Sequence, residues 1–477
     1  MPQTPASVCQ NLSWETLLQP VERRALHHFH HRSALEFSDA LSIDFWRCYI
    51  PSLSLTSPAI RHAIIAASSL HEEFISSGCS LQNSSFALLQ YNKAISAVNT
   101  RLVLEQSSPT SVLGETLTAC ALFVCIEVLL DDYGRALTHL QGGLKLISQL
   151  SSEAQRPLSQ QPYFSEILEL FTRYDSQALN YAGSLESTSC LATVSLERSS
   201  TDWPSLIRSD LTAGRTSEAI QKAATSLRHI VRNAQHYMRS YAKHYKYEIC
   251  QPLHITEARD FHLSLIENWY SEVYPMVNSF PSIQQEGALL SALASLRMSY
   301  HSIRINLLTC LEPCETAYDE YTSDFEAIIY AAEEIICCRK TKHKFTIESI
   351  MIEHVYYTAM KCRDHLLRNR TIAFLRDCER EGVWDGQALA AVAKTAMEIE
   401  ENWTTEMLVA GLLCVSESDL DSSKDTGTRK LFIPEECRIR SLTFNWDKKE
   451  RTLNIFEIER SYFVDGQWAT TSRVVKY

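Results

Sequence analysis

Residues 117–150 read LTACALFVCIEVLLDDYGRALTHLQGGLKLISQL, and this stretch decides the fold class. The first half is apolar on every side apart from Thr118 and Glu127, which is typical of a helix buried among other helices. Asp-Asp-Tyr-Gly interrupts the pattern at residues 131–134. Over residues 137–147, leucine and isoleucine then recur at steps of three and four. The stretch predicts two antiparallel helices, a core helix followed by an amphipathic one.

Similar helical patterns lie on both sides of this hairpin. Ser57 followed by Pro58 is typical of an N-cap and a first helical residue, and an apolar face follows them. Further helices are predicted at residues 86–104, 164–179, 216–246, 257–274, 286–311, 324–338, 346–367 and 385–406. No fixed repeat period is present. The predicted fold class is mainly α, an irregular superhelix of stacked antiparallel helices.

The last part of the sequence changes from helical spacing to alternation. Alternating segments at 437–446, 453–464 and 468–475 are separated by turn residues, including Asp465-Gly466, which is typical of a two-residue hairpin turn. We therefore predict a small antiparallel β-meander and no ordered strand before Leu431. The expected domains are a partly flexible N-terminal segment at 1–43, a helical domain at 44–415, a loop at 416–430, and the meander at 431–477, packed on the helical domain.

Composition and charge narrow the classes of function. The chain of 477 residues has a formal net charge of −12, so its body should bind phosphate backbones poorly without local basic patches. Its 15 cysteines are scattered, which favours reduced thiols in an intracellular protein. No secretory signal is evident. The longest apolar run is shorter than the roughly 18 residues of a membrane span, so we expect no membrane association.

Motifs for catalysis or metal binding are absent from the sequence. It has no Gly-rich phosphate loop, no Gly-x-Ser-x-Gly elbow and no His-Glu-x-x-His pair. Histidines at 27, 28, 30 and 31 could share a helix face as metal ligands, but no motif supplies further ligands, so a polar helix face is preferred. We expect no catalytic residue, no cofactor, no bound metal and no enzyme activity.

One basic cluster, at residues 339–344, is a candidate binding site. Its cations are Arg339, Lys340, Lys342 and Lys344. They could form a nuclear-localisation signal or a phosphate-contacting patch. They also follow a predicted helix, where positive charge offsets the negative end of the helix dipole. The second interpretation is preferred, and the two are compatible.

Several blocks of the sequence resemble the fungal-specific transcription factor domain of binuclear zinc-cluster (C6 zinc finger) regulators. These blocks are Phe45-Trp46, Pro58 to Ala63, Leu70 to Glu72, ALLQYNKAISAVNTRL at 87–102, the hairpin at 117–147, Lys361 to Asp364, Arg380 to Asp385, and Ile399 to Glu401. The resemblance extends over nearly the whole chain from Asp44. The family's zinc cluster begins with a Cys-x-x-Cys pair, and this sequence contains none. Either the chain lacks the DNA-reading module, or a zinc-cluster exon is missing from it.

The resemblance implies a nuclear, non-catalytic transcriptional regulator that controls a metabolic or secondary-metabolite gene set through a partner. The implied partners are a full-length zinc-cluster factor or a co-regulator, as a homodimer or heterodimer, with DNA contacted indirectly. A helical protein-interaction scaffold outside transcription is the alternative. An enzyme with a pocket among its helices is a third hypothesis, which has no named residues to support it.

Overall fold

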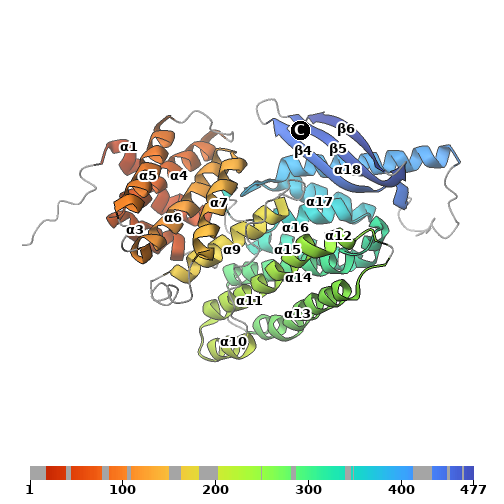
Figure 1. The fold of residues 1–477 in the computed structure, drawn as a ribbon, viewed down its shortest axis with the longest axis horizontal. Helices are drawn as coiled ribbons and strands as arrows, with labels where there is room; N and C mark the ends of the chain where they lie inside the picture. Colours follow the sequence, from red (N-terminus) through yellow and green to blue (C-terminus); the bar gives the residue numbers. More distant parts are fainter. Residues whose placement is uncertain are drawn as a thin grey trace, which may run out of the picture. The chain divides into compact units, whose positions relative to one another are not determined.

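Helix accounts for most of the described chain, and a small antiparallel sheet follows near the C-terminus, so the predicted fold class is confirmed (Figure 1). The structure is a computed structural model. It describes residues 18–38, 44–77, 85–104, 109–149, 163–181, 202–248, 250–280, 286–338, 345–347, 349–411, 432–447, 452–464 and 467–476.

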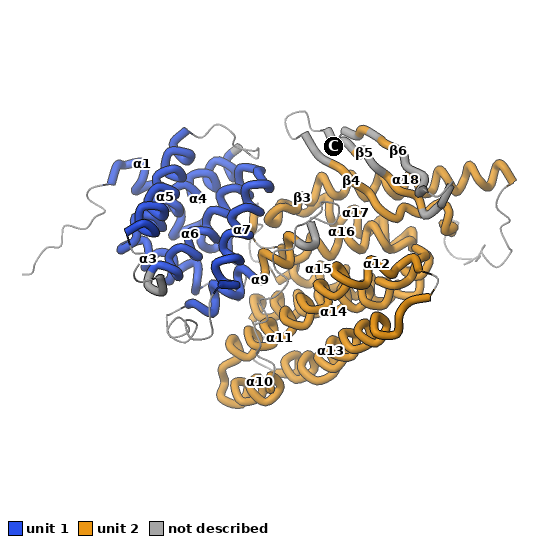
Figure 2. The backbone as a smooth tube through the Cα atoms, in the orientation of Figure 1, with its two compact units in different colours: residues 1–171 blue, residues 172–477 orange. Residues whose placement is uncertain are grey.

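The chain forms two compact units, residues 1–171 and residues 172–477 (Figure 2). This division differs from the predicted boundaries at 43, 415 and 430. Apolar stripes show that each helix buries one face, but they do not show which neighbour covers that face. The sequence therefore predicts helices more directly than it predicts how they group.

The first unit is helical throughout its described residues. Its elements are α1 (Pro20–His28), the π-helical η2 (Phe29–Ser33), α2 (Ala34–Phe37), the π-helical η3 (Phe45–Tyr49), α3 (Ile50–Thr56), α4 (Pro58–Ser77), α5 (Ser85–Leu104), α6 (Pro109–Leu129), α7 (Tyr133–Ser148) and the start of α9 (Phe164–Tyr181). The predicted N-cap is present, because the backbone N–H of Ile60 donates to Ser57 Oγ at 3.2 Å. The segment at 20–37, placed outside the helical domain by the sequence analysis, packs on α4.

The predicted hairpin is confirmed as α6 and α7. Asp131 has a left-handed backbone (φ 62°), and the Asp132 carboxylate accepts a hydrogen bond from the backbone N–H of Arg135 at 3.0 Å. The turn is thus shorter than predicted, since Tyr133 and Gly134 already belong to α7. In α6 an 18-residue segment, Val112–Leu129, has the length and apolar composition of a membrane span, contrary to expectation. Because 83% of it is buried inside the fold, we interpret it as the core helix of this unit.

The second unit contains the remaining elements. Its helices are α10 (Trp203–Thr212), α11 (Thr216–Tyr237), the π-helical η4 (Met238–Ala242), α12 (Lys243–Tyr245), α13 (Leu253–Asn278), α14 (Gly287–Thr309), the 3₁₀ helix η6 (Glu315–Tyr321), α15 (Thr322–Cys338), α16 (Ile352–Lys361), α17 (His365–Asp377), α18 (Gly386–Val409) and the 3₁₀ helix η8 (Glu435–Cys437). The single helix predicted at 346–367 is wrong. Asp364 begins a new helix there, because its carboxylate accepts a hydrogen bond from the backbone N–H of Leu367 at 3.0 Å.

Three short strands lie inside this helical unit, which contradicts the prediction that strands occur only after Leu431. They are β1 (Phe345–Thr346), β2 (Arg380–Glu381) and β3 (Trp384–Asp385). The first two pair in parallel and the last two antiparallel. A strand of two residues is too short to show the alternation of apolar and polar residues by which strands are predicted.

The predicted C-terminal meander is present as β4 (Ile439–Asp447), β5 (Thr452–Val464) and β6 (Gln467–Lys476), all paired antiparallel. The predicted turn residues Asp465 and Gly466 lie outside the described residues. One apolar cluster joins the sheet to α18, and its buried members are Val392, Ala396, Ile399, Ile439, Ile455 and Ile458. The sheet therefore packs on α18 (Figure 1).

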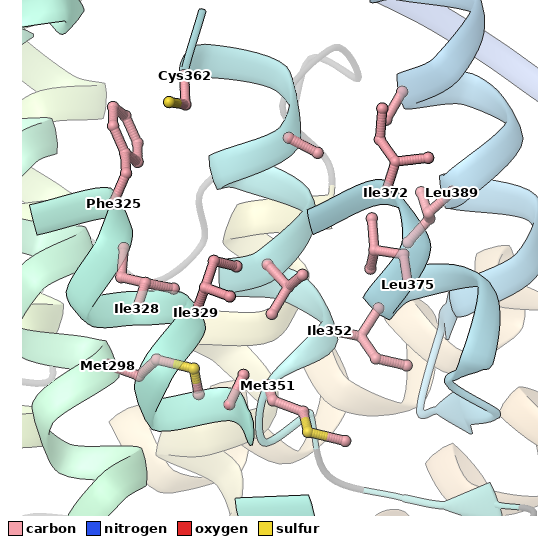
Figure 3. Packing of buried hydrophobic residues seen from close by; sticks show 14 of the residues in the cluster. Met298, Phe325, Ile328, Ile329, Met351, Ile352, Cys362, Ile372, Leu375 and Leu389 are labelled. Atoms are coloured by element: carbon pink, nitrogen blue, oxygen red, sulfur yellow. The ribbon is translucent and has the colours of Figure 1, made fainter. Parts of the chain in front are cut away.

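The main core of the second unit lies among α14, α15, α16, α17 and α18. Its contributing side chains are apolar and buried, and Figure 3 shows several of them between the helices, including Met298, Phe325, Ile328, Ile352, Leu375 and Leu389. Burial of apolar side chains is the main favourable contribution to folding. Helix α18 contributes both to this core and to the cluster under the C-terminal sheet, so it is a central element of the unit.

A close approach between α7 and α9 gives a test of packing in the first unit. A methyl group on Gly143 would overlap the ring of Phe171, whereas one on Gly142 would meet nothing within 4 Å. We predict that Gly143→Ala lowers the free energy of unfolding by about 1–3 kcal/mol, because the core there cannot accept more volume. The measurement is urea unfolding followed by circular dichroism.

Gly142→Ala is the matched control. It lies on the exposed side of the same helix, and alanine is the better helix former, so the free energy of unfolding should rise by up to about 1 kcal/mol. Equal stabilities for the two variants would contradict the packing of α7 on α9.

Candidate functional site

Three sequence blocks that are far apart along the chain meet in the second unit. They are the blocks at 361–364, 380–385 and 399–401, whose residues lie at the end of α16, in the small sheet and on α18. Between them lies an ion network that is buried around Glu315 and Glu400 and reaches the surface at Asp319. Its carboxylates are Glu315, Asp319, Glu400 and Glu435, and its cations are Lys361, Arg363, Arg368 and Arg438.

Glu400 is the centre of this network and is fully buried on α18. Arg363 Nη2 donates to its Oε1 at 2.8 Å, and Arg368 Nη1 donates to its Oε2 at 2.5 Å. The backbone N–H of Ile439, the first residue of β4, donates to Oε1 at 2.7 Å. One carboxylate therefore joins α17, the α16–α17 connection and the C-terminal sheet.

The charge state of Glu400 follows from these contacts. Burial alone would raise the pKa of the carboxyl group, but Arg363 and Arg368 outweigh it and hold the pKa at about 2. The carboxylate is therefore ionised at neutral pH. A buried carboxylate in this state is stable only while its donors remain in place.

A second carboxylate extends the network toward η6. Lys361 Nζ donates to both carboxylate oxygens of Glu315, at 3.0 and 2.8 Å, and to the carbonyl of Arg440 at 3.1 Å. Arg363 Nη1 lies 3.6 Å from Oε2 of the same glutamate. Lys361 and Arg363 thus each contact both a helical carboxylate and the backbone of β4.

The segment just before β4 is attached to η6 by two charged side chains, Arg438 and Glu435. The fully buried Arg438 donates to the carboxylate of Asp319 at 2.8 and 2.5 Å and to the carbonyls of Ile433 and Glu315. In return, the Glu435 carboxylate accepts hydrogen bonds from the first two backbone N–H groups of η6, each at 2.8 Å. These contacts fix where the C-terminal sheet begins.

Each charged residue of the block at 380–385 has a local role. Glu381 Oε2 accepts hydrogen bonds from three successive backbone N–H groups at the start of α16, at 2.8–3.0 Å. Gly382 has φ 55°, and a Cβ there would lie 2.7 Å from the carbonyl of Ile347. Asp385 caps α18 by accepting from the backbone N–H of Ala388. This block therefore orients both helices that carry the network.

The first unit uses polar contacts of the same kind. Arg61 donates to the carbonyls of Ser54 and Leu55, and His62 Nδ1 lies 2.6 Å from the side-chain oxygen of Gln90. His71 lies 2.9 Å from Ser33 Oγ and 3.1 Å from the Glu36 carboxylate. The polar residues that the sequence analysis singled out here connect α4 to its neighbours.

Of the other two candidate sites in the sequence, the structure describes the histidine cluster but not the basic cluster at 339–344. Arg339, Lys340, Lys342 and Lys344 lie outside the described residues. Of the four clustered histidines, His27 and His31 share a face, while His28 is turned inward with Nδ1 3.1 Å from both Ser33 Oγ and Ser68 Oγ. Within the described ranges, no group of three or more His, Cys, Asp or Glu side chains is placed to hold a metal ion.

These arrangements join parts of the chain and do not resemble a reaction centre. A catalytic carboxylate needs a lone pair that a substrate can reach, whereas Glu400 is enclosed and both of its oxygens accept hydrogen bonds. Three members of this network, Lys361, Arg363 and Glu400, lie in the blocks quoted from the sequence. The other five were not singled out: Glu315, Asp319, Arg368, Glu435 and Arg438. The one available signal was a charged residue between two apolar ones, as Arg438 is between Cys437 and Ile439.

Comparison with known proteins gives a family for part of the chain. Residues 24–201 match the family described as the fungal-specific transcription factor domain, which confirms the resemblance over those residues. The match begins inside α1 and ends just before α10, so its bounds differ from the predicted 44–415. The three C-terminal blocks lie outside it.

A curated relative matches over a similar length. The aspercryptin biosynthesis cluster-specific transcription regulator of Emericella nidulans is 26% identical over 184 residues, which are 38% of this chain and 29% of that protein. This chain thus spans less than a third of that relative's length. No solved structure matches the chain.

The buried network predicts a specific response to acid. Because the folded pKa of Glu400 is about 2, below the ordinary 4.5, its contribution to stability is present above about pH 5 and is lost as the pH falls toward 2. We predict that Glu400→Gln lowers the free energy of unfolding by about 3 kcal/mol at neutral pH, since two arginines then lose their counter-charge. This loss should shrink as the pH falls toward 2. Chemical unfolding at several pH values measures it.

Glu398→Gln supplies the control, because Glu398 is exposed on the same helix beside Lys394. That variant should change stability by less than about 0.5 kcal/mol at any of these pH values. A Glu400→Gln variant as stable as Glu398→Gln would show that the network does not hold the unit together.

Proposed function

We propose that this chain, which carries a fungal-specific transcription factor domain over residues 24–201, is a non-catalytic regulator of transcription. The family match is the observation that carries the proposal. The relative in Emericella nidulans supports it, because that protein is named as a regulator specific to one biosynthetic gene cluster. By analogy, we propose that this chain controls a metabolic or secondary-metabolite gene set from the nucleus.

We further propose that the chain acts on DNA through another protein. Its net charge of −12 opposes approach to a phosphate backbone, and its sequence has no Cys-x-x-Cys pair with which a zinc cluster of the family begins. Helical faces can instead bind a partner, either a full-length zinc-cluster factor or a co-regulator. In this mechanism the partner reads the DNA sequence and this chain supplies regulation.

The structure supports the non-catalytic part of the proposal through the state of its buried charges. The carboxylate of Glu400 is ionised, enclosed and bonded to arginines, so it stabilises the fold and is not available for proton transfer. Glu315 is also buried, and both of its carboxylate oxygens accept hydrogen bonds from Lys361. Rigid helices held by such networks suit a protein whose work is binding.

Deletion of the gene is the direct test. We expect transcripts of a co-regulated metabolic gene set to change in the deletion strain and to recover when the wild-type gene is restored. A tagged protein should lie in the nucleus. Purification from nuclei should recover a DNA-binding protein, and chromatin occupancy of the tagged chain should disappear when that partner is deleted.

Other outcomes decide among the alternatives. Unchanged transcripts together with a tagged protein outside the nucleus would favour an interaction scaffold unrelated to transcription. Sequence-selective DNA binding by the purified chain alone, persisting at raised salt, would contradict action through a partner.

A further inference from the structure

A π-helical segment turns one tyrosine out of the second unit. The buried face of α11 includes Ala234 and Tyr237, and the next buried residue is Ala242, five positions later. Across this interval the backbone N–H of Lys243 donates to the carbonyl of Met238, five residues back. In a regular α-helix Tyr241, seven residues after the buried Ala234, would lie on the same buried face, yet its side chain is 52% exposed.

The π turn explains this displacement. A π-helical turn contains one residue more than an α-helical turn would, so the residues after it are rotated around the helix axis. Ala242 takes the buried position that the sequence spacing assigned to Tyr241. The described chain also has the π-helical segments η2 and η3, which bury the aromatic side chains of Phe29, Phe45 and Trp46. By contrast, η4 exposes a large aromatic ring, and π-helical turns are frequent at functional sites, so this end of the helix is a candidate binding surface.

Neighbouring residues enlarge this surface. Tyr247 is 44% exposed, and Leu253, the first residue of α13, is 70% exposed. The start of α13 lies beside the end of α11, since Tyr237 Oη donates to the carbonyl of Ile255 at 2.7 Å, and beside α12, since the ring centroids of Tyr245 and His254 are 6.4 Å apart. We define the basic–aromatic surface as Tyr241, Lys243, His244, Lys246, Tyr247 and Leu253.

The charge of this region is opposite to that of the whole chain. Residues 219–247 contain six Lys or Arg and no Asp or Glu, within a chain of net charge −12, and the exposed Glu248 ends this run. Some of these cations are neutralised, as Lys222 is by Asp210 and Arg232 by Asp175. Lys243 is exposed and forms no ion pair with any residue in the described part of the chain. The basic–aromatic surface therefore combines positive charge with exposed rings.

One more cation is fixed at its edge. The Arg440 guanidinium lies over the Tyr247 ring, 4.7 Å from its centroid, and also contacts the Glu459 carboxylate at 2.9 Å. The ring is thus held by a cation on one side. A preorganised ring loses little freedom when a partner binds to it.

From this surface we propose that the second unit binds an acidic, apolar segment of a partner protein. Exposed Tyr and Leu side chains gain most from apolar partners, and Lys243 and Lys246 favour carboxylates. A nucleic acid would meet the repulsion of the whole chain along its length, whereas a peptide brings few charges. The inference deepens the proposed function by giving the chemistry of the partner.

Peptide binding to the purified chain is measured in vitro, whereas the proposed function is tested by gene deletion. The two proposals can therefore fail separately. The probe is a fluorescein-labelled synthetic peptide in which Asp and Glu alternate with Leu and Phe, titrated with the full chain and followed by fluorescence anisotropy. We expect saturable binding that weakens with salt. Lys243→Glu should weaken it about tenfold, because an attractive charge becomes repulsive. Tyr241→Ser should weaken it at every salt concentration.

Arg208→Glu is the matched control. Arg208 is an exposed cation on α10, which packs at the start of α11, where Asp210 pairs with Arg215 and Lys222. The basic–aromatic surface lies at the opposite end of α11, about 33 Å away at 1.5 Å per residue. This variant undergoes the same change of charge and should bind as the wild type does.

Two results would overturn the inference. One is wild-type peptide affinity in both Lys243→Glu and Tyr241→Ser, each shown to be folded by circular dichroism. The other is tighter binding of a labelled single-stranded oligonucleotide than of the peptide, with loss in the same variants, which would make this surface a nucleic-acid site.

Discussion

A carboxylate that is removed from water must be surrounded by donors, and this constraint organises the second unit. Glu400 meets it with two arginines and the first backbone N–H of β4. Removing either arginine would leave one oxygen of this buried carboxylate without its charged donor, which is destabilising. The helices α17 and α18 and the C-terminal sheet are therefore coupled energetically as well as packed together, and Glu315 and Asp319 extend the coupling to η6.

Buried polar side chains in the first unit also need hydrogen-bond partners. Its polar side chains are held in smaller groups, such as His62 with Gln90, and Tyr91 with Glu127 at 2.8 Å. These groups hold α4, α5 and α6 at fixed positions along one another. In both units, the buried charged side chains described above therefore form contacts that stabilise the fold. The family match of residues 24–201 lies mainly on the first unit, and the basic–aromatic surface lies on the second.

Exposed features carry more information about function here than buried ones. The buried networks explain why residues such as Glu381 and Asp385 are placed where they are, because each caps a helix. They do not explain why η4 contains a π turn that exposes Tyr241. A regular α-helix would have buried this ring and gained the free energy of its burial. A binding role gives a physical reason for the lost burial.

The sequence by itself determined the helical class, most helix positions, the α6–α7 hairpin and the C-terminal meander. These follow from periodicity and capping, which act between residues close in the chain. Only the tertiary structure decided the division at residue 171, the pairing of Glu400 with Arg363 and Arg368, and the exposure of Tyr241. The first two depend on contacts between residues distant in the chain. The third depends on a single additional residue in one helical turn, and no periodic pattern records it.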